Sequence, residues 1–483
     1  MQDTEYRVFV HNGKYSSWNF IDTKTQSHIE FPNIIPHERK LFNNDIFTLN
    51  NETNEITVLS SMAKTQTLTG VLVLDKTYGK DEKPGKSPKA AKYFYKCIPH
   101  DKHYPEFLIS YNITNGFSKT QVPLYVCFCF KQWTNKHPVG TIVKTIGSID
   151  VLSNFYEYHI ACKNLDFPLK DFKEQSVKAM KHLKCQPNEY ILKTSAEFKI
   201  EDRRHIETYT IDNSDTSDFD DAFSIYTDSE NNTVISIYIS NVTFWMNNLD
   251  LWNAFSERIA TIYLPDQKRP MIPTLLSDSL CSLKKNEPRI AFTMDIKIPK
   301  SEDWLSTSES LSPQLTFKNT LIQVNENFSY DNWNKNPLYN NYFTNLLEIL
   351  QPLSKDNLKD SHDLIHFLMV YMNHNVAKEL IKHKCGIYRN VSYTSHDDNI
   401  PKSIPTTVYN YLNQYRYSVG HYVNFEHVSN HEFLKFDSYL HITSPIRRLV
   451  DLLNLVSIQQ HLGLIDFNRN VKVFHNKWNN RID

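Results

Sequence analysis

Apolar and polar side chains alternate most clearly over residues 233–242, Thr-Val-Ile-Ser-Ile-Tyr-Ile-Ser-Asn-Val. A period of two with β-branched residues predicts a strand, and residues 124–130 predict another in the same way. The apolar spacing over residues 362–384 predicts a long helix that ends before Gly386. The chain therefore mixes strands and helices, and we expect an α+β fold.

An aspartate-rich loop precedes the strand at 233–242. No Lys or Arg interrupts it, and β-forming residues at 207–210 lead into it, so we expect a loop held by a sheet. Carboxylates this close together cannot all stay ionised in a partly buried place without a cation. Oxygen ligands alone suit Mg²⁺ or Mn²⁺. The five acids of this loop are Asp212, Asp215, Asp218, Asp220 and Asp221.

Two simpler interpretations of this loop stay open. Asp, Asn, Ser and Thr are also typical of a solvated turn. A calcium loop of the EF-hand kind fits the start of the segment, but Ser217 stands where that loop needs Gly and Phe223 where it needs Glu.

A second segment with candidate chemistry is His441-Ile-Thr-Ser-Pro-Ile-Arg-Arg448. Ser444 as N-cap and Pro445 as first helical residue predict a helix that ends at Gly463. Arg447 and Arg448 would then lie in the first turn, where the helix dipole disfavours cations. A docked anion, usually phosphate, would explain them. The alternative, an ion pair with one carboxylate, would leave one arginine unexplained.

These residues resemble the signatures of the RNase II (RNB) exoribonucleases. Asp212, Asp218, Asp220, Asp221 and Ala222 match the family's aspartate signature, and residues 443–448 match its Thr-Ser-Pro-Ile-Arg-Arg segment. Residues 262–265 and 271–283 resemble family segments in the right order. Residues 98–106 and 133–147 resemble the second cold-shock barrel of the eukaryotic, exosome-type branch, and residues 37–48 resemble the end of a first barrel.

The resemblance implies a division into domains. Residues 1–70 would form a first cold-shock (OB-type) barrel, and 71–170 a second one with a lysine-rich loop between Lys76 and Lys96. Residues 171–200 would be a helical linker. Residues 201–483 would form the RNB catalytic domain.

The resemblance also implies an activity: Mg²⁺-dependent hydrolytic 3′→5′ degradation of single-stranded RNA to 5′-mononucleotides, with Mn²⁺ as an alternative ion. Asp212, Asp218, Asp220 and Asp221 would hold the metal. Asp221 and Arg447 would be catalytic, the acid orienting the attacking water and the arginine holding phosphate. The residues that would contact RNA are Tyr263, Tyr330, His431, Ser444, Arg447 and Arg448.

Some positions depart from the family pattern. His366 and Phe367 stand where the family has two glutamates, and Asn241 stands where it usually has aspartate. A catalytically inactive RNB-like protein that binds RNA or serves as a scaffold is therefore the alternative function.

Composition and charge narrow the class of protein. Lys+Arg number 53 and Asp+Glu 54 in 483 residues, so any RNA path must be a local basic channel. The seven cysteines are not spaced in the pairs that are typical of metal sites, and we expect them to be reduced thiols. No apolar run reaches membrane-spanning length, and the N-terminus lacks the form of a signal peptide. We expect a soluble intracellular protein, in the cytoplasm or alternatively the nucleus, whose partners are RNA and an RNA-degradation or other complex.

Overall fold

The computed structural model describes residues 4–50, 53–81, 92–113, 121–182, 186–299, 313–335, 340–354, 357–392, 404–409, 412 and 420–482. The chain divides into two compact units, residues 1–167 and 168–483. The central part of the predicted lysine-rich loop, residues 82–91, lies outside the described residues. No helix among those described is long and apolar enough to cross a membrane.

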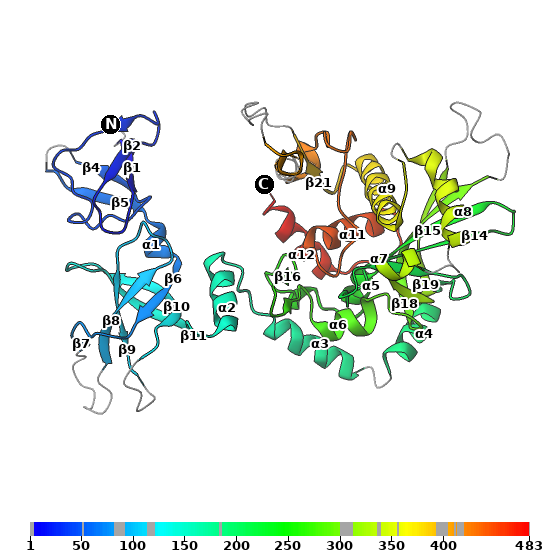
Figure 1. The fold of residues 1–483 in the computed structure, drawn as a ribbon, viewed down its shortest axis with the longest axis horizontal. Coiled ribbons are helices and arrows are strands. Elements are labelled where there is room, and N and C mark those ends of the chain that lie inside the picture. The colour runs from blue at the N-terminus through cyan, green and yellow to red at the C-terminus, as the bar shows by residue number, and fades with distance from the viewer. Residues whose placement is uncertain are drawn as a thin grey trace. The chain divides into compact units, whose positions relative to one another are not determined.

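The first unit begins with a five-stranded antiparallel sheet, drawn in blue in Figure 1. Its strands are β1 (Glu5–Val10), β2 (Trp18–Asp22), β3 (His28–Ile29), β4 (Ile46–Leu49) and β5 (Ile56–Ser60). β1 pairs with both β2 and β4 and therefore lies in the centre of the sheet. Val8 and Val10 of β1 and Phe47 of β4 are buried in the unit's core.

The second sheet of this unit closes on itself. Its main strands are β6 (Thr67–Val73), β8 (Lys92–Pro99), β9 (Phe107–Tyr111), β10 (Leu124–Gln132) and β11 (Val139–Ser148), and β7 (Lys80–Asp81) extends one edge. β6 pairs with both β8 and β10, which completes a ring of five strands. A Cβ on Gly70 would lie 2.6 Å from the carbonyl oxygen of Ile98, so this crossing of strands needs glycine.

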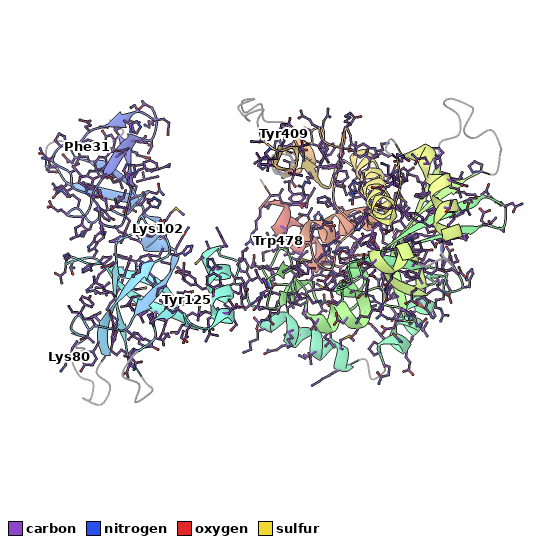
Figure 2. The ribbon with its side chains drawn as sticks, in the orientation of Figure 1. Phe31, Lys80, Lys102, Tyr125, Tyr409 and Trp478 are labelled. Atoms are coloured by element: carbon purple, nitrogen blue, oxygen red, sulfur yellow. The ribbon has the colours of Figure 1, made fainter. Side chains whose placement is uncertain are left out.

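Helix α2 (Leu152–Cys162) packs on the outside of this barrel. Tyr158 of α2 stacks on Tyr125 of β10, with ring centroids 4.3 Å apart; Tyr125 is labelled in Figure 2. The strand predicted at 124–130 is confirmed, and its alternate residues Val126 and Phe128 are buried inside the barrel.

The second unit is built on a seven-stranded sheet. In spatial order its strands are β12 (Glu201–Asp202), β19 (Gln314–Gln323), β18 (Pro288–Ile298), β15 (Thr233–Ser240), β14 (Asp221–Thr227), β13 (Tyr209–Asp212) and β20 (Glu326–Ser329). β15 confirms the strand predicted from alternation. Isoleucines 235, 237 and 239 all belong to one core, as a period of two requires.

Helices cover this isoleucine face. They are α7 (Tyr330–Lys335), α8 (Asn340–Leu350) and the long α9 (Ser361–Lys382), drawn in yellow-green and yellow in Figure 1. Leu346, Leu350, Leu364 and Leu368 are buried against the sheet's isoleucines in a common core. The helix predicted at 362–384 is thus confirmed to within two residues at each end.

A second core lies around helices α5 (Val242–Asn248), α11 (Leu449–His461) and α12 (Arg469–Asn479). Trp478 of α12, labelled in Figure 2, is 6% exposed there. Residues predicted as a linker form α3 (Lys170–His182) and α4 (Pro187–Glu197), and Phe172 and Ile191 are buried in this same core. The domain boundaries themselves stay a prediction.

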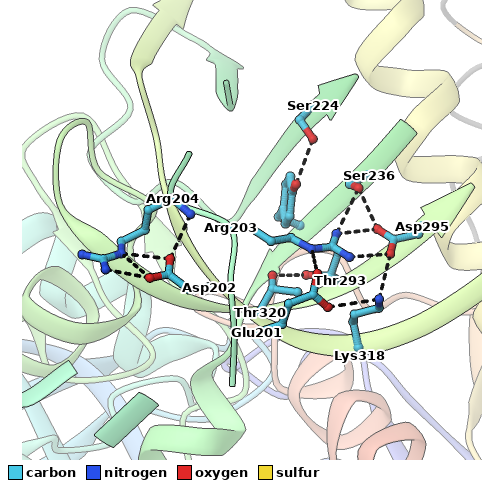
Figure 3. Close-up of polar contacts among 11 residues, drawn as sticks. Glu201, Asp202, Arg203, Arg204, Ser224, Ser236, Thr293, Asp295, Lys318 and Thr320 are labelled. Atoms are coloured by element: carbon cyan, nitrogen blue, oxygen red, sulfur yellow. Dashed lines mark hydrogen bonds and ion pairs between the residues drawn. The ribbon is translucent and has the colours of Figure 1, made fainter. Parts of the chain in front are cut away.

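The other face of the sheet carries a buried polar group (Figure 3). Arg203 donates to both carboxylate oxygens of Asp295 at 2.8 Å, and the two side chains are only 4% and 7% exposed. Ser236 donates to the same carboxylate at 2.6 Å. The pair ties the residue after the short strand β12 to β18 in the middle of the sheet.

Candidate active site

A cavity of about 810 Å³ opens at one end of the second unit's sheet. It brings together residues from the aspartate loop, helix α9 and the arginine segment, which are far apart in sequence. All but one of the residues predicted to form the site line it. They are Asp212, Asp218, Asp220, Asp221, Tyr263, Tyr330, Ser444, Arg447 and Arg448.

The sheet positions the acids. Asp212 is the last residue of β13 and Asp221 the first of the antiparallel strand β14, so both lie at the same end of the sheet. Asp221 shares the face of Phe223, which packs in the core beneath α8 and α9. Asp220 is 3% exposed and accepts a 2.9 Å hydrogen bond from the backbone N–H of Ile446. The aspartate loop is therefore held by a sheet, as predicted.

The acids are poorly compensated within the protein. Burial raises the pKa of Asp212 to about 6 and that of Asp220 to about 7. The pKa of Asp221 lies well above its ordinary value, because of burial and then of its neighbours Asp212 and Asp220. Oδ2 of Asp212 and Oδ2 of Asp220 are buried without a hydrogen-bond partner. A bound cation would offset the repulsion among these buried carboxylates.

Asp218 has a different environment. Lys268 donates to its two carboxylate oxygens at 2.7 and 2.8 Å and to Oγ of Ser217 at 2.5 Å. Lys268 belongs to β17 (Lys268–Arg269), which pairs with β16 (Ile262–Tyr263). The fourth acid of the predicted metal set is thus already paired with a cation.

The arginine segment corrects one sequence-based prediction. The helix α11 begins at Leu449, five residues after Ser444, so Arg448 is the N-cap residue and Arg447 precedes the helix. Asp451 accepts a 2.8 Å hydrogen bond from the N–H of Ser444 and binds Arg448 at 2.8 Å. These bonds hold residues 444–447 as a separate turn. The predicted end at Gly463 is correct, since its φ of +63° follows the last helical turn.

Arg447 is the arginine closest to the acids. Its Nε lies 3.3 Å from Oδ2 of Asp220, and its Nη2 donates to Oγ of Ser444 at 3.1 Å. Its side chain is 46% exposed to the cavity and the solvent. Arg448, in contrast, is engaged by Asp451. The predicted carboxylate alternative therefore holds for Arg448, while Arg447 has donors available for an anion.

The two predicted tyrosines lie on different walls. Tyr263 is 58% exposed and is the β-sheet partner of Lys268. Tyr330 stacks on His362 of α9, with ring centroids 3.7 Å apart and planes 12° apart. Burial raises the pKa of Tyr330 to about 12, with Asp221 and Asp212 adding to the shift. Tyr330 therefore lies near the acids.

His431 is the one predicted site residue that does not line the cavity. It is 5% exposed, and its Nδ1 accepts a hydrogen bond from the N–H of Leu434 at 3.2 Å. Burial lowers its pKa to about 4, so the ring is neutral at pH 7. It packs edge-on against Tyr439, which does line the cavity. His431 therefore lies behind Tyr439 and supports this part of the cavity wall.

Sequence reasoning did not single out several lining residues. Lys268 is the most important, and it stands between the two family-like segments at 262–265 and 271–283. Its position five residues after Tyr263, across a tight turn, was the only signal available. The others include Asn373 and Tyr439.

The residues present fit a hard divalent ion. The donors are carboxylate oxygens, two of which are buried without a hydrogen-bond partner. Among the described residues no three His, Cys, Asp or Glu side chains are arranged to hold a metal together. Mg²⁺ does not need three, because it is usually bound through one or two carboxylates, with waters and substrate phosphates completing its shell. Asp212, Asp220 and Asp221 can supply these one or two carboxylates.

Comparison with known proteins adds to this geometry. Residues 200–336 match the model of the RNB domain. The chain carries an RNB domain. The match covers β13, β14 and the aspartate loop between them, and the cavity lies on this RNB domain and the residues that follow it.

Ribonuclease R of Chlamydia pneumoniae is 26% identical over 388 residues, which cover 64% of this chain and 54% of that protein. The chain thus spans about half the length of this relative. Such relatives support membership of the RNB exoribonuclease family. A bacterial relative does not test the eukaryotic, exosome-type branch, which stays a prediction.

Two solved structures share the fold. Mycoplasma genitalium RNase R in complex with ribose methylated single-stranded RNA has a TM-score of 0.67 at 16% identity, covering 99% of this chain and 82% of that one. Yeast Ssd1, described as a pseudonuclease, has a TM-score of 0.58 at 12% identity, covering 99% and 71%. The predicted α+β class, with two OB-type barrels before the RNB domain, is confirmed.

Proposed function

We propose that this protein is a metal-dependent hydrolase that removes nucleotides from the 3′ end of single-stranded RNA and releases 5′-mononucleotides. One observation carries the proposal. Three acids of limited exposure, Asp212, Asp220 and Asp221, and the half-exposed guanidinium of Arg447 face one cavity. Phosphodiester hydrolysis needs this combination, because negative charge develops on phosphoryl oxygens while water attacks.

The chain's own residues would have distinct roles. Asp212, Asp220 and Asp221 would hold Mg²⁺ or Mn²⁺, which when bound lowers the pKa of water and offsets charge on phosphate. Asp221 would orient the attacking water. Arg447 would bind the phosphate, steadied by Ser444 and Asp220. Arg448 would act behind it through its bond to Asp451.

The choice of RNA and of direction rests on relatives. The matched relative is named ribonuclease R. Of the two solved structures described above, the one with the higher TM-score is Mycoplasma genitalium RNase R in complex with single-stranded RNA. Tyr263, exposed at the cavity wall, supports a stacking contact with a base. Membership of an RNA-degradation complex and an intracellular location belong to the same proposal.

A catalytically inactive RNA-binding module is the second candidate. Two observations favour it: Asp218, predicted to hold metal, is paired with Lys268, and the fold is shared with a pseudonuclease. The two candidates differ in cleavage and not in RNA binding.

An RNA ladder assay separates them. The protein is incubated with 5′-labelled single-stranded RNA and Mg²⁺, beside Asp221→Asn and the exposed-loop control Asp215→Asn. We expect the wild type and Asp215→Asn to shorten the RNA from its 3′ end, and Asp221→Asn to be slower by at least about a hundredfold. Equal binding of RNA by all three, with no shortening in Mg²⁺ or Mn²⁺, would establish the inactive module.

A further inference from the structure

The carboxylates of the cavity fall into two environments. Asp212 and Asp220 each keep a buried Oδ2 atom without a hydrogen-bond partner. Asp218 is equally enclosed, with 6% of its side chain exposed, yet both of its oxygens accept from Lys268. The same loop therefore contains one acid whose two oxygens accept from a lysine, Asp218, and two acids that each keep an oxygen without a hydrogen bond. Of these two, Asp220 faces Nε of Arg447 at 3.3 Å.

Lys268 is fully engaged in this place. An ammonium group has three N–H donors, and Nζ of Lys268 has three oxygen acceptors, two on Asp218 and one on Ser217. Its side chain is 28% exposed, so the contact is partly shielded from solvent. Such a contact is stronger than a surface ion pair because the surrounding water screens it less.

The hairpin that carries Lys268 is braced at several points. Lys268 and Tyr263 are direct partners in the β16–β17 pair. Arg269 binds both oxygens of Asp266 across the turn, at 2.5 and 2.7 Å. The N–H of Thr261 donates to the carbonyl oxygen of Arg447 at 2.9 Å, which joins this hairpin to the arginine turn. The backbone of Lys268 is thus fixed relative to both groups of charges.

The carboxylates that line the cavity outnumber the cations that face them. Four carboxylates of limited exposure line the cavity, namely those of Asp212, Asp218, Asp220 and Asp221, and Asp215 is exposed to water. Two cations face them, Lys268 and Arg447, while Arg448 is neutralised by Asp451. A formal charge of −2 remains, which one divalent ion offsets.

We propose that Lys268 is a built-in cation that takes the place of a metal ion at Asp218, so that the site binds a single divalent ion through one or two of the carboxylates of Asp212, Asp220 and Asp221. This inference rests on the proposed metal-dependent function and assigns Lys268 as a positioning residue that sets the number of ions. Removing its charge should open Asp218 to a second ion.

Metal binding without RNA tests the inference directly. The full chain, stripped with EDTA, is titrated with Mn²⁺, and free Mn²⁺ is counted by its electron paramagnetic resonance signal. We expect one ion per chain for the wild type and two for Lys268→Met, whose side chain is similar in length and uncharged. Lys268→Arg keeps the charge and should bind one ion.

The control is Lys285→Met, which removes another lysine–carboxylate pair, with Glu326, outside the cavity. It should bind one ion, as the wild type does. Thermal unfolding of each variant shows that it is folded, and Lys268→Arg tests the inference even if Lys268→Met does not fold, since loss of the single ion there would contradict it.

Other outcomes overturn the inference in distinguishable ways. Two ions in the wild type, or one ion in both wild type and Lys268→Met, would reject the role of Lys268 while RNA cleavage leaves the proposed function intact. A wild type that binds no Mn²⁺ and leaves RNA uncut would reject both.

Discussion

At the scale of single residues, the buried carboxylates that suit the site to a metal ion also lower the stability of the metal-free folded protein. Asp220 is 3% exposed, and burial raises its pKa to about 7. Its ionised form is therefore less favourable in the fold than in the unfolded chain, where an aspartate has a pKa of 3.8. This destabilisation is absent below about pH 4, grows between pH 4 and 7, and is complete above pH 7.

We therefore predict that Asp220→Asn stabilises the metal-free protein at pH 8 by something on the order of 2 kcal/mol and has little effect at pH 4. Asparagine keeps an oxygen to accept from Ile446 and carries no charge. The measurement is the melting temperature in EDTA at both pH values.

The control for this comparison is Asp228→Asn. Its carboxylate pairs with Lys297 at 2.9 Å, and that ion pair lowers its pKa to about 2, so this variant should gain no stability at pH 8. Added Mg²⁺ should raise the melting temperature of the wild type more than that of Asp220→Asn. Equal stability of wild type and Asp220→Asn at pH 8 in EDTA would contradict the account of the acids.

At the scale of elements, the polar pair behind the sheet determines how its edge is held. Only two residues of β12 pair with β19, and Arg203 follows them directly. The buried Arg203–Asp295 pair therefore carries much of this attachment (Figure 3). Removing the Asp295 carboxylate leaves the buried guanidinium with the half-exposed Glu201 as its remaining carboxylate partner at 2.7 Å, which compensates its charge less well.

Asp295→Asn should consequently destabilise the second unit by about 3 kcal/mol. The neighbouring pair Arg204–Asp202 is an internal control, because its side chains are 38% and 46% exposed; Asp202→Asn should cost less than about 1 kcal/mol. Urea unfolding of both variants measures the difference. Similar losses in the two variants would show that burial does not determine the strength of these pairs.

The elements also show how far sequence reasoning reaches. Strong periodicity located β15, β10 and α9, and the aspartate spacing located the acids, because such patterns are local. The prediction that α11 begins after Ser444 was wrong. Asp451, inside the helix, accepts a hydrogen bond from the N–H of Ser444, so residues 444–447 form a turn that is separate from the helix. Lys268 was missed because a single lysine gains meaning only when folding brings it to Asp218.

At the scale of the whole molecule, the two units have separate cores. Among the described residues, all those that line the cavity belong to residues 168–483, whereas the two barrels share a core within residues 1–167. A truncated protein of residues 168–483 therefore keeps all the described residues that line the cavity and lacks both barrels.

We predict that residues 168–483 produced alone fold and still shorten an RNA of about five nucleotides, while affinity for a longer RNA falls about tenfold or more, since OB-type barrels add contacts along the strand. Circular dichroism and RNA binding by fluorescence anisotropy measure these two effects. A folded truncation that retains full affinity for long RNA would show that the barrels contribute nothing to RNA binding.

The central claim is that this RNB domain hydrolyses RNA from the 3′ end with a metal bound by its buried acids. The most direct measurement uses single-stranded RNA carrying a radioactive phosphate before its last nucleotide, with products separated by thin-layer chromatography. The account predicts a labelled 5′-mononucleotide as the first product in Mg²⁺, and none in EDTA or with Asp221→Asn. Intact RNA across Mg²⁺ and Mn²⁺ concentrations, in a protein that binds the same RNA, would contradict it.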